Sequence, residues 1–97
     1  MNRTVLERKL SSATRRLKEL REELAVVEEQ LASLADDAHD TRLRALVSET
    51  PLAGREHHEA QRHADAMARH RGGVVACIEA LERSQDDLLD RLMAEVR

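Results

Sequence analysis

Four histidines gather within fourteen residues, in the only stretch of this sequence that carries the side chains of a metal or acid–base site. They are His57, His58, His63 and His70, and Glu56 and Glu59 lie among them. On a helix, Glu59 and His63 lie one turn apart, and His70 follows His63 on the same face. Glu59, His63 and His70 are therefore the candidate ligands of a weak metal site.

The spacing of these residues departs from the helical metal motifs. Di-iron bundles use Glu-x-x-His, whereas three residues separate Glu59 from His63. The order His-Glu-x-x-His is also absent. We therefore expect no metal and no cofactor, and expect surface histidines that face an acidic stretch of the chain. A weak metal site and a pH-dependent switch, in which protonated histidines strengthen attraction between helices, are the alternatives.

The sequence offers little support for catalysis by other residues. The sequence contains no glycine-rich phosphate loop and no nucleophile elbow. Cys77 lies in an apolar run, 74–78, so we expect a buried or half-buried, inert thiol. A single cysteine permits no internal disulfide and fits a reducing compartment, with an intermolecular disulfide as the alternative. We expect a cytoplasmic protein that is not an enzyme.

The composition favours long helices. The 97 residues are 41% hydrophobic and 36% charged, and contain no Phe, Tyr or Trp. This balance is typical of coiled coils and predicts one all-α domain over residues 1–97. A net charge of −3 argues against general nucleic-acid binding, and no apolar run approaches the roughly 20 residues that span a membrane.

Apolar residues that alternate in steps of four and three predict a first helix over about 3–38. This seam comprises Leu6, Leu10, Ala13, Leu17, Leu20, Leu24, Val27, Leu31, Leu34 and Ala38. The cluster of Asp36, Asp37 and Asp40 then breaks the heptad phase. We expect a short second helix over about 41–48, capped by Asp40 or Thr41.

A third, long helix is predicted over about 51–96. Thr50 can cap it and Pro51 occupies its first position. Its seam is Ala53, Ala60, Met67, Val74, Leu81 and Leu88, joined by Ala64, Ile78 and Leu92. A companion column is mostly polar: Glu56, His63, His70, Cys77 and Ser84. Gly72 and Gly73 favour a local distortion or kink.

Charge predicts how the long helices pair. Residues 1–21 carry net +5, 22–40 net −7, 41–71 net +2 and 72–97 net −3. An antiparallel coiled-coil hairpin brings opposite charges together, whereas a parallel arrangement opposes like charges. A bare hairpin buries little apolar area, so we expect dimerisation into a four-helix bundle. Leu10, Leu17, Leu20, Leu24, Leu31, Leu81 and Leu88 form the expected self-association seam.

Two charged surfaces are candidates for partner binding. The first is the basic start of the first helix, including Arg8, Lys9, Arg15 and Arg16. These residues could bind an acidic protein, a nucleotide or a phosphate backbone. Alternatively, they could form a solvated face that only lies opposite the acidic residues near the end of the chain. The second is the acidic turn of Asp36, Asp37 and Asp40. In this feature the chain resembles the N-terminal coiled-coil domain of the Gre transcript-cleavage factors, which insert an acidic tip into RNA polymerase. The resemblance covers the hairpin and not the family's globular domain.

These observations predict a small non-enzymatic adaptor or regulator that binds a protein partner through its helical faces. RNA polymerase or a transcription factor is a plausible partner. A self-associating structural module is the first alternative, and a metal- or nucleotide-binding helical bundle is the second.

Overall fold

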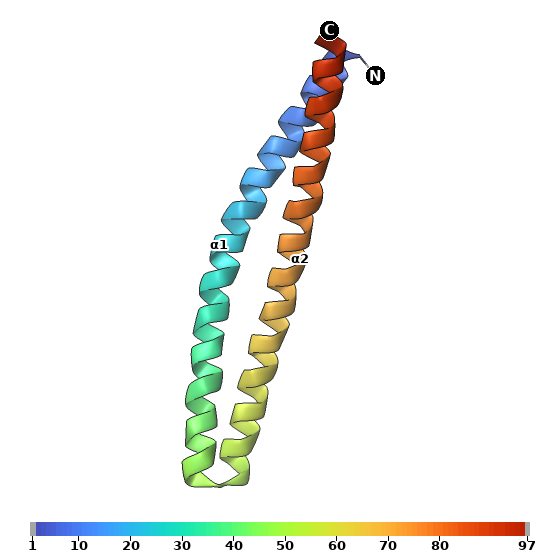
Figure 1. Cartoon of the computed structure of the whole chain (residues 1–97). Helices are drawn as coiled ribbons and strands as arrows, with labels where there is room; N and C mark the ends of the chain where they lie inside the picture. The colour runs from blue at the N-terminus through green and yellow to red at the C-terminus, as the bar shows by residue number, and fades with distance from the viewer. Residues whose placement is uncertain (1, 97) are drawn as a thin grey trace. The chain divides into compact units, whose positions relative to one another are not determined.

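The computed structural model describes residues 2–96, which form two long helices and no strand (Figure 1). α1 spans Arg3–Ser48 and α2 spans Pro51–Val96. The predicted all-α class with two long helices is confirmed. The chain divides into two compact units: unit 1 comprises Met1–Leu24 with Val74–Arg97, and unit 2 comprises Ala25–Gly73.

Short polar residues define where each helix begins. The Asn2 Oδ1 accepts the backbone N–H of Val5 at 2.9 Å, and the Thr50 Oγ1 accepts that of Ala53 at 3.2 Å. Both are N-cap contacts, which satisfy a backbone donor that has no partner inside the helix. α1 ends where Glu49 takes a left-handed backbone conformation, φ 52°. A turn of two residues therefore joins the helices within unit 2.

The prediction of a separate short helix over 41–48 is wrong, because α1 continues unbroken to Ser48. Thr41 does not act as an N-cap. Its hydroxyl donates to the carbonyl oxygens of Asp37 at 2.8 Å and Ala38 at 3.0 Å, and the residue is buried. A threonine inside a helix commonly donates its hydroxyl hydrogen to a carbonyl oxygen of the preceding turn in this way, whereas an N-cap hydroxyl accepts a backbone N–H. The seam continues from Ala38 through Thr41 to Ala45 in the same steps of three and four.

Buried and half-buried residues recur in alternating steps of four and three along both helices. In α1 the buried and half-buried positions include the predicted seam and extend it to Thr41 and Ala45. In α2 the seam comprises Ala53, His57, Ala60, Ala64, Met67, Arg71, Val74, Ile78, Leu81, Gln85, Leu88 and Leu92, and Val75 beside it is also half-buried. Such a strict repeat is the pattern of coiled-coil packing. The leucines predicted as a self-association seam thus face the other helix of their own unit.

Three α2 seam positions, fourteen residues apart, are polar, and each contacts a polar side chain of α1. The pairs are His57 Nδ1 with Thr41 Oγ1 at 3.4 Å, Arg71 Nη2 with Glu28 Oε1 at 3.2 Å, and Gln85 Nε2 with Thr14 Oγ1 at 3.0 Å. Residue numbers fall along α2 as they rise along α1, so the helices of each unit are antiparallel. Polar pairs in an apolar seam specify register, because a shifted register leaves them unpaired.

The best-packed core lies in unit 1. Leu17 and Leu20 of α1 form a buried cluster with Val74 and Ile78 of α2. Leu24 and Leu81 pack against this cluster and are half-buried. With no aromatic side chain in the protein, the stabilisation of unit 1 by apolar burial depends on aliphatic packing of this kind.

Gly72 and Gly73 lie inside continuous α2, which predicts that alanine at both positions stabilises the protein. Nothing lies within 4 Å of a Cβ placed on either residue, and neither φ is positive. Alanine in a helix interior is favoured over glycine by about 1 kcal/mol per residue. The double variant Gly72→Ala/Gly73→Ala should therefore raise the free energy of unfolding by about 1–2 kcal/mol, measured by urea denaturation.

The reverse change at exposed Ala76 is the matched control. Ala76→Gly should lower the free energy of unfolding by about 1 kcal/mol. If the double alanine variant were less stable than wild type, the glycines would be needed for a distorted helix, as the sequence suggested.

Candidate partner-binding groove

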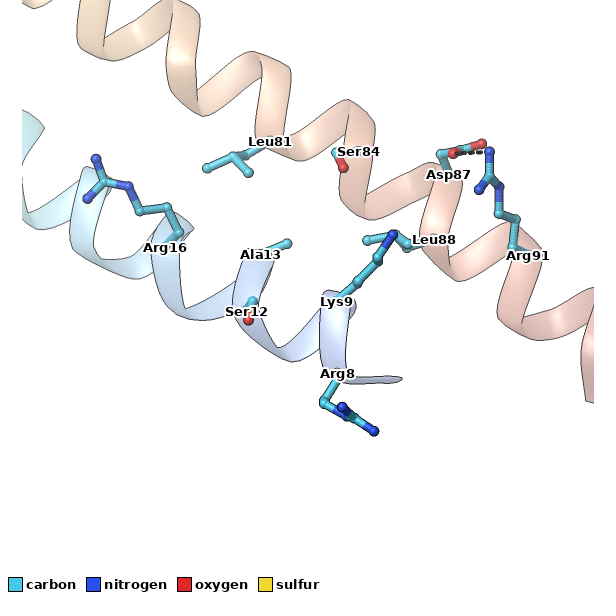
Figure 2. A pocket seen from close by; sticks show the side chains of 10 residues that line it. All are labelled: Arg8, Lys9, Ser12, Ala13, Arg16, Leu81, Ser84, Asp87, Leu88 and Arg91. Atoms are coloured by element: carbon cyan, nitrogen blue, oxygen red, sulfur yellow. Dashed lines mark ion pairs between the residues drawn. The ribbon is translucent and has the colours of Figure 1, made fainter. Parts of the chain in front are cut away.

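A hollow of about 610 Å³ lies between the two helices of unit 1. α1 contributes Arg8, Lys9, Ser12, Ala13 and Arg16, and α2 contributes Leu81, Ser84, Asp87, Leu88 and Arg91 (Figure 2). We call it the basic groove. It combines four cationic side chains with one carboxylate, two hydroxyls and three apolar residues.

The heptad positions explain why these side chains converge. Lys9 and Arg16 are seven residues apart on α1, and Ser84 and Arg91 are seven apart on α2. In each case the residues flank the seam on the same side of their helix. Antiparallel pairing brings the two columns together, so cations from both ends of the sequence border one groove.

The floor of the basic groove is apolar. Ala13 and Leu88 are buried, and Leu81 is half-buried. Figure 2 shows Ala13, Leu81 and Leu88 between the helices, with Lys9 extending from α1 toward Leu88. An apolar floor with a charged rim suits an amphipathic segment better than a free anion.

Two cations of the rim form surface ion pairs. Arg91 Nη2 lies 3.3 Å from Asp87 Oδ2, and Arg16 Nη1 lies 3.2 Å from Glu19 Oε2. All four side chains are about half exposed. Such pairs contribute about 0–1 kcal/mol, so an incoming carboxylate can replace them at little cost.

The predicted basic residues divide between two hollows. Arg8, Lys9 and Arg16 border the basic groove, whereas Arg15 lies in a separate hollow with Leu10, Thr14 and Lys18. Arg21 Nη2 lies 3.5 Å from Glu82 Oε2 of α2. This ion pair is one of the contacts expected if the basic start of α1 lies opposite the acidic residues near the end of α2.

The prediction of an acidic turn is wrong. Asp36, Asp37 and Asp40 lie within α1, whereas the turn is formed by Glu49 and Thr50. The three aspartates are part of the helix because Thr41 and Ala45 continue the seam of α1 beyond them. Four exposed apolar side chains lie in the helix ends that flank the turn: Leu43, Leu46, Val47 and Leu52. The three aspartates on which the resemblance to the Gre factors rests therefore lie away from the turn, where Glu49 is the acidic residue.

The structure separates the candidate metal ligands. Glu59 and His63 border a hollow of about 270 Å³ together with Asp37 and Glu56, but His70 is not part of its lining. Among residues 2–96, no three His, Cys, Asp or Glu side chains are placed to hold a metal ion. His57 is not a surface group facing acidic residues, because it occupies the seam beside Thr41.

Cys77 is exposed, so the prediction of a buried or half-buried thiol is wrong. Its neighbours Val74 and Ile78 occupy the seam, which turns Cys77 toward solvent. A run of five apolar residues on a helix cannot face inward throughout, because successive residues are about 100° apart.

Arg91, Ser84 and Asp87 were not predicted as groove residues. Their position depends on the register between α1 and α2, which the charge blocks indicated only coarsely. The detectable signal was the seven-residue spacing of Ser84 and Arg91 beside the seam of Leu81 and Leu88. Matching this column with Lys9 and Arg16 across an antiparallel pair locates the groove.

Comparisons of the chain with protein-family models, curated proteins and solved structures found no match. Within residues 2–96, neither helix has an apolar stretch of the length and hydropathy needed to cross a bilayer.

Proposed function

We propose that this protein is a small non-enzymatic adaptor or regulator whose basic groove binds an acidic amphipathic helix of a partner protein. The observation that carries the proposal is the combination of four cations with an apolar floor between two antiparallel helices. A third helix can lie along the groove of a helix pair, with apolar side chains against Ala13, Leu81 and Leu88. Its carboxylates would then reach the four cations of the rim, Arg8, Lys9, Arg16 and Arg91.

The charge of the groove lining supports an acidic partner. Four cations and one carboxylate give this lining a net charge of +3, although the whole chain carries −3. Because exposed charges are screened beyond roughly 8 Å at physiological salt, the partner senses this local charge and not the total. Arginine also binds carboxylates in a bidentate manner, and three of the four cations are arginines.

Affinity capture of the tagged protein from a lysate of its native host tests this proposal. We expect a stoichiometric partner that is retained at about 0.15 M salt and released near 1 M, where screening shortens to about 3 Å. An RNA polymerase subunit or a sigma factor is the specific candidate, and mass spectrometry would identify it. The proposal also places the protein in the cytoplasm, as the single cysteine suggests. Recovery of nothing except the tagged chain would contradict it.

Self-association is the second candidate function. It is favoured by three exposed apolar residues at the end of α2, because such side chains in a row mark interaction surfaces. Leu89, Met93 and Val96 are 41%, 60% and 63% exposed. In this case the protein would be a structural module that binds its own copy.

A further inference from the structure

The face of unit 1 opposite the basic groove presents an apolar row beside a hollow. On α2, Glu82, Leu89 and Val96 are spaced by sevens and share one column, and Met93 lies one turn after Leu89. On α1, Thr14 and Arg21 form the facing column, since Arg21 pairs with Glu82. Leu89, Met93 and Val96 are therefore uncovered on this face.

The hollow on the same face has a volume of about 500 Å³. Leu10, Ser11 and Thr14 border it at the level of the first turns of α1, with Arg15 and Lys18 at its other end. Leu10 is half-buried, so part of an apolar side chain lies open in the hollow. The size and lining fit one or two aliphatic side chains.

We infer that this face binds a second copy of the chain, through a two-fold axis parallel to the helices of unit 1. The inference rests on the self-association proposal and names its surface. Such an axis places α1 of one copy beside α2 of the other at the same level. Because Thr14 contacts Gln85 within one copy, Leu89 and Met93 of the second copy then lie opposite the hollow. The contact occurs twice, as an isologous interface requires.

The charges on this face agree with the same pairing. α1 presents Arg15 and Lys18, whereas α2 presents Glu79 and Asp86 in the column that leads to Met93. In the two-fold arrangement, the level set by Thr14 and Gln85 places Arg15 of one copy near Asp86 of the other. It places Lys18 near Glu79. Opposite charges therefore flank the apolar contact, and complementary edges of this kind fix the register of an interface.

Sedimentation velocity of the purified full-length chain tests the inference. We expect a mass of about twice 11.0 kDa for the wild type. The variant Leu89→Lys/Met93→Lys should sediment as a single chain and keep its circular dichroism spectrum, because both side chains are exposed. The variant Lys18→Glu should dissociate more readily, and Lys18→Glu/Glu79→Lys should recover the dimer.

The matched control is Leu46→Lys/Val47→Lys, which changes two exposed apolar residues of unit 2 and should leave the dimer intact. A wild-type dimer that survives Leu89→Lys/Met93→Lys would overturn the proposed face but not self-association. A wild-type chain that stays monomeric at about 0.5 mM would overturn both. Dissociation by the unit 2 control alone would move the interface to that unit and overturn this one.

Discussion

Replacing Leu17 by alanine is expected to lower the free energy of unfolding by about 2–5 kcal/mol. Leu17 is 1% exposed and belongs to the cluster with Leu20, Val74 and Ile78. Alanine removes three carbon atoms from this contact and leaves a cavity that the surrounding helices only partly close. The loss is large because domains of this size have a total stability of about 5–15 kcal/mol.

Thermal denaturation followed by circular dichroism measures this effect. For a domain of about 100 residues, 1 kcal/mol corresponds to about 4–8 °C, so the Leu17→Ala midpoint should fall by about 10 °C or more. Leu46→Ala is the matched control, since Leu46 is 63% exposed and should change stability by less than about 0.5 kcal/mol. Equal effects of the two substitutions would show that α1 and α2 do not pack through Leu17.

The seam of α1 was predictable up to Ala38 because its residues are almost all leucine or valine. Beyond Ala38 the pattern became hard to recognise. The positions that continue it, Thr41 and Ala45, are weakly apolar, whereas the more apolar Leu43 and Leu46 are exposed. Composition alone therefore suggested a break in the helix. Extending the steps of three and four would have predicted a single helix to Ser48.

In α2, the column spaced by sevens from Ala53 was predictable, and so was the apolar half of its companion column, Ala64, Ile78 and Leu92. Half of the positions in the true companion column are polar: His57, Arg71 and Gln85. Each is tolerated because α1 supplies a polar partner at the same level, which no periodicity within one helix reveals. The prediction therefore left these three positions out of the seam and took as companion a neighbouring column with His63 and Cys77, which the structure exposes.

Part of the candidate site was also predictable. Arg8, Lys9 and Arg16 stood out as a basic strip, whereas Arg91 lies in a segment of net charge −3. Its place in the groove follows from three-dimensional pairing, not from local composition. Arg15 follows Arg8 by seven residues in the same column, so periodicity alone did not indicate that the two border different hollows.

Reversing charge in the basic groove is expected to abolish partner capture. In Arg8→Glu/Arg16→Glu, two cations that would face partner carboxylates become carboxylates themselves. Opposed like charges cost several kcal/mol, so affinity should fall by about 100-fold or more. The fold should tolerate the change, because Arg8 and Arg16 are exposed and the Arg16–Glu19 pair is a surface pair.

The matched control carries the same change in charge away from the groove. Arg62 and Arg69 are exposed, lie seven residues apart on α2 and belong to unit 2. Arg62→Glu/Arg69→Glu should change affinity by less than about threefold, since its charges lie outside the contact and are screened. Unchanged circular dichroism spectra for both variants would confirm that neither has lost its helices.

The most direct measurement is therefore a side-by-side capture from native-host lysate with wild type, Arg8→Glu/Arg16→Glu and Arg62→Glu/Arg69→Glu as baits. The account predicts the same stoichiometric partner on wild type and on the unit 2 control, and its loss from the groove variant. Retention of that partner by a folded Arg8→Glu/Arg16→Glu bait would contradict the account and leave these arginines as a solvated face.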